Sequence, residues 1–471
     1  MKKTTLYTFG KSVVASAILL LVVTGCKKAV TVEPPAGQLT GPIIFENEGT
    51  AVAALTGIYN RMINSIGFAS GSFGSVSFVT GLTADELISQ GGDENGQFYR
   101  NDILSRNAIM TMQLWNLAYN HIYSANTVIE GVRKSAALSE AAKTQLEGEA
   151  RFIRAFSHFY LVNLWGKIPT VATTDYQQNN IASKVEPDSV YRFIENDLLD
   201  AINLLNSDYV SGIADVTAER IRPNSFAARA LLARVYLYTG RWAEAEAMAS
   251  SVIASSGTYQ LANITDVFLM NNPEAIWQLQ STSPGSNTPD ARVYIINEGN
   301  LPTTAILSPS LINTFEAGDL RRSNWMDSVI TNGVTYIFPF KYKELQTGET
   351  KEYTTVMRLA EQYFIRAEAR AESGNLTGAA DDLNIIRIRA GLPELTDALT
   401  KDEIIDAVMH ERRVEFFTEW GHRWLDLKRR SMVNAVMSAE KPASWQETDQ
   451  LFPIPESETL INPRLTQNPG Y

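Results

Sequence analysis

The hydrophobic and polar positions of this chain repeat mainly with the period of an α-helix. Apolar residues recur every three or four positions at 46–63, and a Gly/Ser-rich interval at 65–77 then breaks the pattern. Farther on, Trp115, Tyr119 and Ile122 share one helical face. We expect further helical blocks at 106–134, 137–164, 188–206, 223–254, 355–390 and 401–436. The pattern therefore predicts a mainly α fold.

The helical period fades between residues 256 and 354. Short strand-like runs replace it, most clearly at 275–280 and 335–338. We expect a loop-rich segment with short strands to interrupt the helical part of the chain.

Two helical blocks carry the same arrangement of small residues. With identical gaps of seven and five, the matching positions are Ala233, Gly240 and Ala245 in one block and Ala367, Gly374 and Ala379 in the other. Small residues at these places let two helices pack closely across a tight turn, as in tetratricopeptide repeats. The copies lie 134 residues apart, far more than the period of a tandem array, which is about 34 residues. The sequence thus predicts dispersed helix pairs and not a simple solenoid.

The first 42 residues have the pattern of a lipoprotein leader and tether. A basic start precedes an apolar stretch from Val13 to Val23, and Gly25-Cys26 then completes a lipobox. We expect residues 1–25 to be a signal peptide and Cys26 to carry the lipid anchor. Residues 26–42 are rich in Pro and Gly and predict a flexible tether.

Composition and charge exclude several classes of function. The 471 residues carry a formal net charge of −11, which disfavours a nucleic-acid partner. Because Cys26 is the one cysteine, an internal disulfide, a Cys-rich zinc site and a CxxC redox motif are excluded.

The sequence offers little for catalysis or metal binding. It contains no GxSxG elbow, no phosphate-binding GxxxxGK[ST] loop and no GxGxxG after a strand. We expect His121 and His158 to be packing residues, and His410 and His422 match no ligand spacing. We therefore predict no catalytic residue, no metal site and no cofactor, although a carboxylate pair of a glycosidase is not excluded by sequence.

Charged residues near the C-terminus have the spacing of helical salt bridges. Arg412 with Glu415, and Arg423 with Asp426, are three positions apart. We expect salt-bridged packing of these pairs, and a buried arginine–carboxylate network that fixes how the last helices dock.

The same C-terminal residues carry a family resemblance. Residues 410–429, HERRVEFFTEWGHRWLDLKR, closely resemble the SusD/RagB pattern ERRxEL-x-x-E-G-x-R-x-x-DLxR. The FPIP at 452–455 and the NPRLTQNPGY at 462–471 are similar to the end of that family's chains. Three other segments agree in family order, namely 149–169, 228–245 and 384–392.

The resemblance implies a fold and a role. The fold is a SusD-like α-helical scaffold with dispersed tetratricopeptide-like helix pairs and loop or short-strand excursions. It forms one domain at 43–471, divided into an N-terminal part (43–255), a loop-rich insert (256–354) and a C-terminal helical part (355–471). The role is that of a non-catalytic, lipid-anchored outer-membrane protein that binds glycan nutrients and delivers them to a SusC-like TonB-dependent transporter.

The resemblance also indicates where ligand would bind, because family members contact ligand through loops outside the helical repeats. The corresponding intervals here are 83–99 and 281–294. A sugar site needs an aromatic platform beside hydrogen-bonding side chains. The predicted ligand-binding residues are the platforms Phe98, Tyr99 and Tyr294 and their companions Asn95, Gln97, Asp290 and Arg292.

Several alternatives stay open at this point. Neither interval contains Trp, which disfavours starch, and a peptide ligand, as in some RagB-like members, remains an alternative. A tetratricopeptide-type adaptor is a further one. Lys27 and Lys28 directly follow Cys26, where surface-exposed members usually have acidic residues, so the side of the outer membrane is open.

Overall fold

The computed structural model of the chain describes residues 41–471 except 66, 70, 298–304, 346–347 and 397–398. The predicted signal peptide, Cys26 and nearly all of the predicted tether lie outside these residues. The chain divides into two units, Met1–Ile44 and Phe45–Tyr471. The described part of the first unit is the short helix α2 (Gly41–Ile44). In the part of the chain that the structure describes, none of the helices is long and apolar enough to cross a membrane.

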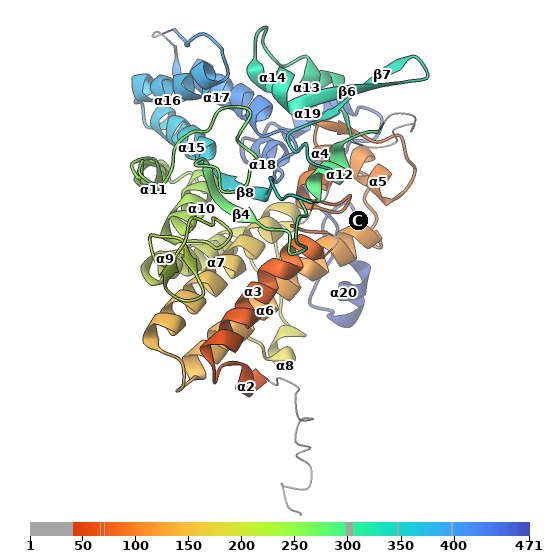
Figure 1. The fold of residues 1–471 in the computed structure, drawn as a ribbon. Helices are drawn as coiled ribbons and strands as arrows, with labels where there is room; N and C mark the ends of the chain where they lie inside the picture. Colours follow the sequence, from red (N-terminus) through yellow and green to blue (C-terminus); the bar gives the residue numbers. More distant parts are fainter. Residues whose placement is uncertain (1–40, 66, 70, 298–304, 346–347, 397–398) are drawn as a thin grey trace, which may run out of the picture. The chain divides into compact units, whose positions relative to one another are not determined.

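The second unit is mainly helical, as predicted (Figure 1). Its longer helices are α3 (Glu48–Asn64), α4 (Val76–Thr83), α6 (Asn116–Lys134), α7 (Glu140–Trp165), α9 (Pro187–Leu204), α10 (Ser225–Tyr238), α11 (Trp242–Ile253), α15 (Leu359–Glu372), α16 (Leu376–Arg389), α17 (Lys401–Glu415), α18 (His422–Arg429) and α19 (Val433–Glu440). Its shorter helical segments are α5 (Glu94–Arg100), the π-helix η2 (Ile109–Trp115), α8 (Tyr176–Asn179), α12 (Asp290–Tyr294), α13 (Pro309–Ile312), α14 (Leu320–Trp325), the 3₁₀-helix η3 (Glu447–Gln450) and α20 (Glu456–Ile461). The predicted helical blocks are confirmed.

Polar caps define where several helices begin. Asn47, Ser139 and Asn224 each accept a backbone N–H of the first turn of α3, α7 and α10. Thr400 and Glu403 form a reciprocal capping box at the start of α17.

The long helices pack side by side in one continuous series. Each contacts the next in the order α6, α7, α9, α10, α11, α15, α16 and α17. The loop-rich segment leaves this series after α11 and rejoins it at α15. Helix pairs that are far apart in sequence therefore become neighbours in space.

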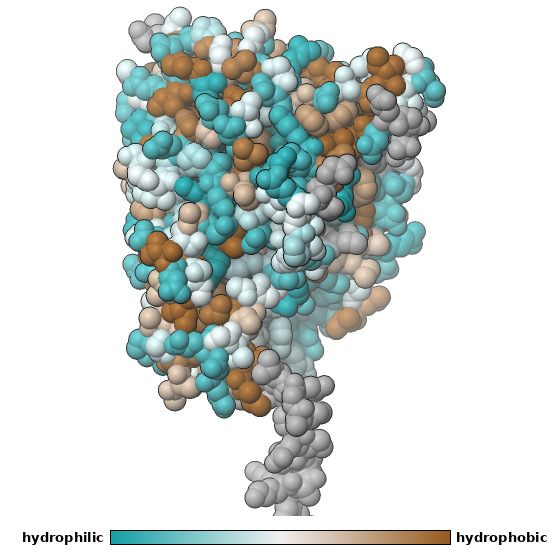
Figure 2. All heavy atoms as spheres, viewed as in Figure 1, coloured by the Kyte–Doolittle hydropathy of each residue, from teal (hydrophilic) through white to brown (hydrophobic). Residues whose placement is uncertain are grey.

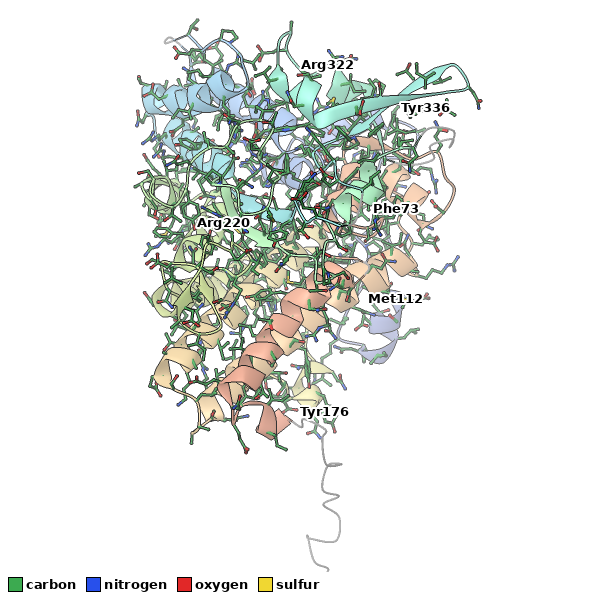
Figure 3. The ribbon with its side chains drawn as sticks, viewed as in Figure 1. Phe73, Met112, Tyr176, Arg220, Arg322 and Tyr336 are labelled. Carbon is green, nitrogen blue, oxygen red and sulfur yellow. The ribbon has the colours of Figure 1, made fainter. Side chains whose placement is uncertain are left out.

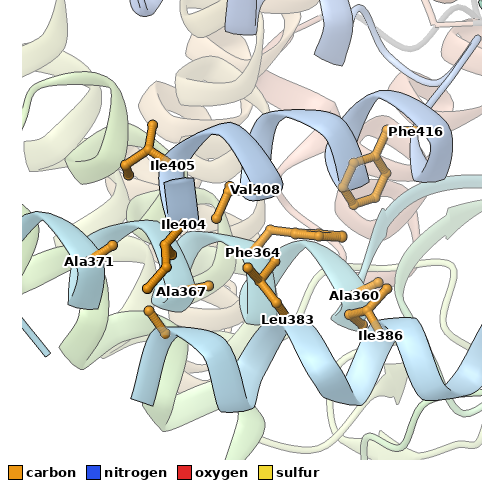
Figure 4. Packing of buried hydrophobic residues seen from close by; sticks show 11 residues of the cluster. Ala360, Phe364, Ala367, Ala371, Leu383, Ile386, Ile404, Ile405, Val408 and Phe416 are labelled. Carbon is orange, nitrogen blue, oxygen red and sulfur yellow. The ribbon is translucent and has the colours of Figure 1, made fainter. Parts of the chain in front are cut away.

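The tetratricopeptide-like pairs predicted from small residues are confirmed as α10–α11 and α15–α16. Gly240 and Gly374 adopt positive φ values of 69° and 87° at the turns between the paired helices. Ala233, Ala245, Ala367 and Ala379 are all fully buried. Beside them, Phe364, Leu383, Ile404 and Val408 fill the space between α15, α16 and α17 (Figure 4).

Half of the strands that the structure describes lie within the loop-rich segment. The strands are β1 (Leu87–Ile88), β2 (Val210–Ser211), β3 (Asp215–Val216), β4 (Ala275–Leu279), β5 (Ile306–Leu307), β6 (Met326–Thr331), β7 (Val334–Pro339) and β8 (Thr354–Arg358). They form four antiparallel pairs, β1–β5, β2–β3, β4–β8 and β6–β7. Asn332 and Gly333, both with positive φ, form the tight turn of the β6–β7 hairpin. The predicted strands at 275–280 and 335–338 are confirmed as β4 and β7.

Candidate ligand-binding site

The seven predicted ligand-binding residues lie on two short helices. Four of them are on α5 and three are on α12. Both helices adjoin α4, since α5 packs against α4 and Phe78 of α4 contacts Tyr294, with ring centroids 6.0 Å apart.

The α5 residues mainly serve packing and turn formation. Phe98 is fully buried, with its ring 5.5 Å from that of Phe452, so it presents no open face. Gln97 accepts hydrogen bonds from the Leu104 amide and from Asn107. Asn95 is buried, and Tyr99 is half-buried with the Lys441 ammonium 5.1 Å from its ring centroid. A ligand therefore cannot stack on Phe98 in this conformation, whereas Tyr99 and Gln97 are partly accessible.

The α12 residues divide in the same way. Tyr294 is 4% exposed, and burial raises the pKa of its hydroxyl well above the usual value. Asp290 is also buried and accepts hydrogen bonds from Thr288 (2.7 Å) and Thr354 (2.9 Å). Arg292 is exposed. Of these three, only Arg292 can meet a ligand without rearrangement of the loop.

An exposed aromatic ring that the sequence pattern did not reveal contacts α4 next to Tyr294's partner Phe78. Phe73 is 46% exposed and its ring centroid is 5.1 Å from that of Phe78, which contacts Tyr294 in turn. Figure 3 shows Phe73 beside α12. The ring belongs to the Gly/Ser-rich interval that was predicted only as a break between helices. An exposed ring that rests against a buried ring is a platform for the apolar face of a ligand.

The segment around Phe73 and the end of α3 both pack against the 281–294 segment. A Cβ on Gly71 would lie 2.3 Å from the Asp290 amide nitrogen, so only glycine fits there. Asn64 at the end of α3 donates to the Thr282 hydroxyl at 2.7 Å. We use the name loop face for the exposed residues Asn64, Phe73, Thr282 and Arg292 of these neighbouring loops and helix ends.

A cleft of about 350 Å³ adjoins the loop face and shares Thr282 with it. One wall is the α3 surface around Gly57 and Asn60, and the other includes Arg222 and Gln280. Arg222 is paired with the buried Glu149, with 3.0 Å between its Nε and the carboxylate. The exposed polar groups of the cleft are therefore the amides of Asn60 and Gln280 and the Thr282 hydroxyl, which suit a neutral, hydroxyl-rich ligand.

The surface on the side drawn in Figure 2 does not favour a purely apolar ligand. Hydrophilic residues there separate the hydrophobic ones into several patches. The amides and hydroxyls of the cleft agree with this mixed character.

Five of the buried carboxylates belong to a buried ionic core. We use this name for Glu274, Asp319, Arg321, Lys341, Arg358, Arg389, Glu411, Glu415 and Glu419. Arg358 alone contacts Glu274 at 2.9 Å, Glu415 at 2.6 Å and Glu419 at 2.9 Å. Several guanidinium groups hold the pKa of Glu415 far below its usual range. Such groups are paired and enclosed, which is unfavourable for general acid–base work on a large substrate.

The structure corrects the predicted pairing of the C-terminal charges. Arg412 pairs with Asp426 at 2.7 Å and Arg423 pairs with Asp85 at 2.7 Å, so both predicted partners at three positions are wrong. The reason is that α17 ends at Glu415, whose carboxylate turns toward arginines of the loop-rich segment and of α16. The broader prediction of a buried arginine–carboxylate network at the last helices is confirmed.

Another buried carboxyl, that of Glu86, has a strongly raised pKa. Burial and the neighbouring charge of Asp85 raise the pKa of Glu86 to about 8. Its residue is 2% exposed, and its carboxyl accepts a hydrogen bond from the Thr418 amide. Asp85 and Glu86 belong to the interval predicted to contact ligand, but they lie in the interior and join α4 to the C-terminal motif.

The histidines are mostly structural. His121 and His158 are buried, as predicted, and burial lowers the pKa of each to about 3. His410 lies near Glu316 and Glu411, close enough together for a metal ion. However, Arg387 contacts both carboxylates, at 2.7 Å in the case of Glu316, and Arg321 contacts Glu411 at 2.8 Å. These guanidinium groups already supply the positive charge, so we assign an ion-pair network there.

Known proteins resemble the chain over almost its full length. Residues 67–237 match a family model described as "Starch-binding associating with outer membrane", and residues 312–471 match one described as "SusD family". The SusD-like protein P2 of Formosa agariphila is 26% identical, in an alignment that covers 96% of this chain and 98% of that protein.

Solved structures share the architecture. A SusD superfamily protein from Bacteroides vulgatus has a TM-score of 0.77 at 21% identity, covering 91% of this chain and all of that one. A structure described as a laminarin-binding SusD-like protein has a TM-score of 0.72 at 25% identity, covering 90% of this chain and all of that one. At 21% identity, the likeness to the Bacteroides vulgatus protein shows a shared fold and nothing about the ligand.

Proposed function

The chain belongs to the SusD/RagB family, and from this membership we propose that it captures a neutral glycan at the loop face without cleaving it. The observation that carries the proposal is the exposed Phe73 ring, which is held edge-to-face against the buried Phe78. Thr282, another residue of the loop face, lines a cleft whose exposed polar groups are amides and a hydroxyl. An aromatic ring covers the C–H face of a sugar, while amides and hydroxyls bond its hydroxyl groups. Tyr99, Gln97 and Arg292 are the accessible members of the residues predicted from sequence, and Arg292 lies on the loop face itself.

The names of related proteins support a glycan as the ligand. One relative of known structure is described as binding laminarin, and the family model for residues 67–237 is described as starch-binding. A peptide is the alternative ligand, and the test below includes it.

Delivery and location complete the proposal. We expect Cys26 to anchor the protein at the outer membrane and a SusC-like TonB-dependent transporter to receive the glycan. The family description that mentions the outer membrane supports this location. Replacing Cys26→Ser should abolish incorporation of a palmitate analogue and move the protein to the soluble fraction. Retention of both label and membrane association in this variant would contradict the anchor.

The binding site is tested by calorimetric titration of the full-length protein. The probes are four neutral hexasaccharides, laminarihexaose, maltohexaose, cellohexaose and mannohexaose, and a mixture of hexapeptides. Phe73→Ala should weaken binding of a hexasaccharide by about tenfold, because a stacked ring contributes on the order of 1 kcal/mol. Tyr336→Ala is the matched control, since Tyr336 is a partly exposed ring on β7, away from Phe73 (Figure 3).

The outcomes separate the candidate ligands. Loss of hexasaccharide binding in Phe73→Ala, with the control unchanged, supports the loop face. Equal affinity in both variants contradicts this site, and binding of peptides alone contradicts the glycan.

A further inference from the structure

A second cavity lies on a different part of the helical unit. Its volume is about 320 Å³, and α6, the segment around α8, and α20 contribute to its lining. These three helices lie near one another in Figure 1. None of its lining residues belongs to the cleft beside the loop face. We call it the amide pocket.

Aromatic rings form the wall of the amide pocket that α6 provides. Trp115, Tyr119 and Tyr123 are four positions apart, so they follow one face of the helix. Trp115 is buried and its ring centroid is 4.9 Å from that of Tyr119. Tyr119 donates its hydroxyl proton to the Pro169 carbonyl at 2.9 Å, which fixes its ring. Tyr123 is 51% exposed and offers an open ring at the end of this series.

Amide side chains surround the rings. Asn116 and Asn120 on α6 and Asn180 after α8 are exposed, and their side chains form no hydrogen bond with the rest of the described chain. Each can donate two hydrogen bonds and accept two. Such unused amides beside an open ring are the groups that recognise a ring of hydroxyls.

The charge of the pocket selects against anionic ligands. Glu458 contributes a carboxylate, and no lysine or arginine lines the pocket among the described residues. A carboxylate accepts from sugar hydroxyls but repels phosphate, sulfate and uronate groups. The volume is at the lower end of the range for ligand sites, which begins at about 300 Å³.

The backbone just before α6 also supports a binding role for this pocket. The π-helix η2 runs from Ile109 to Trp115, and the Asn116 amide bonds to the Thr111 carbonyl five residues back. Turns of this type cost stability and occur frequently at functional sites. Here the π-helix ends at the ring that supports Tyr119.

We propose that the amide pocket is a second saccharide site, which takes a short neutral stretch of a glycan chain. Tyr123 covers the C–H face of a sugar ring, and Asn116, Asn120 and Asn180 bond its hydroxyl groups. Two sites on one chain raise the apparent affinity for a long glycan without tighter binding at either site. The proposal stands on the chemistry of this pocket and does not require the loop face to bind.

The experiment is calorimetric titration of the full-length protein with the same four neutral hexasaccharides. The test variant is Asn120→Ala/Tyr123→Ala, whose exposed positions leave the core intact. Met112→Ala is the matched control, because Met112 is 64% exposed near the start of α6 and does not line the pocket (Figure 3). Tyr123→Trp keeps an aromatic face and should retain binding, and hexagalacturonate serves as the anionic probe.

We expect two classes of site in the wild-type protein. The test variant should weaken one class at least tenfold, and Phe73→Ala should weaken the other. The wild type could instead show a single class of site. If the test variant removes it and Phe73→Ala does not, the result supports the amide pocket and contradicts the loop face.

Other results overturn the inference. One is a test variant with the same affinities as the wild type. Another is an equal loss of hexasaccharide affinity in Met112→Ala. The third is binding of hexagalacturonate with the same affinity as the neutral hexasaccharides. Binding that only Phe73→Ala removes overturns the amide pocket and leaves the proposed function standing. Absence of any hexasaccharide binding by the wild type contradicts both.

Discussion

At the scale of single residues, the buried carboxyl of Glu86 makes folding sensitive to pH. Its pKa is raised to about 8 in the folded protein, against 4.5 for an ordinary glutamate. Between these values the folded state keeps a proton that the unfolded state releases. The contribution of this carboxyl to stability is therefore fully present below pH 4.5 and is lost as pH rises toward 8.

Glu86→Gln should remove this decline. We expect the variant to be more stable than the wild type at pH 8.5, by up to about 5 kcal/mol, and to differ much less at pH 5. Urea denaturation at the two pH values measures the difference. Glu456→Gln, at an exposed position of α20, is the control and should follow the wild type. Equal pH dependence in Glu86→Gln and the wild type would contradict the argument.

Glu415 has the opposite character, because it stays charged among arginines. Its removal leaves Arg358, Arg321 and Arg389 with less compensation in the interior. Glu415→Ala should lower the free energy of unfolding at pH 7 by about 3–5 kcal/mol. Asp102→Ala, which breaks the exposed pair with Arg100, should cost about 1 kcal/mol or less. Similar costs for the two variants in urea denaturation would show that the ionic core is not a determinant of stability.

These residue-scale contacts explain why charge pairing was only partly predictable. The presence of a buried network followed from the density of arginines and acids in the C-terminal motif. Its partners did not, because Glu274, Arg321 and Arg358 come from segments 57 to 141 residues away from Glu415 in the chain. Helical spacing predicts contacts only between residues three or four positions apart.

At the scale of secondary-structure elements, glycine conformation decides how each helix pair turns. Gly374 has a φ of +87° and open space where a Cβ would lie, so an alanine there is strained but does not clash. Gly57, inside α3, has ordinary helical geometry and also has open space.

Two alanine variants should therefore shift stability in opposite directions. Gly374→Ala should lower the free energy of unfolding by about 1 kcal/mol, because alanine disfavours positive φ. Gly57→Ala should raise it by about 0.5–1 kcal/mol through helix propensity. Chemical denaturation of both variants checks the signs. A stabilising Gly374→Ala would contradict the assigned turn.

Helical periodicity predicted the long helices well because their buried faces repeat regularly. The strand β6 was not predicted from the sequence. Asn332-Gly333 is a strong hairpin signal, but only the run that follows it was recognised as a strand. Helical periodicity also placed Trp115 and Tyr119 on one helical face, which the structure confirms, but it gave no sign that both residues line a pocket.

At the scale of the whole helical unit, the scaffold was more predictable than the site it carries. The family motifs lie in the interior, where packing and ion pairs constrain many residues at once. A loop aromatic has no such pattern, so sequence could not distinguish the buried Phe98 and Tyr294 from the exposed Phe73. The predicted segment 281–294 does reach the candidate site, through Thr282 and Arg292.

The central claim is that this protein captures a glycan and does not cleave it. The most direct test is calorimetric titration of the full-length protein with the four hexasaccharides, followed by chromatographic sizing of the recovered sugar. The account predicts that at least one hexasaccharide binds and is recovered with its length unchanged. Shortened products, or no binding to any of the four, would contradict it.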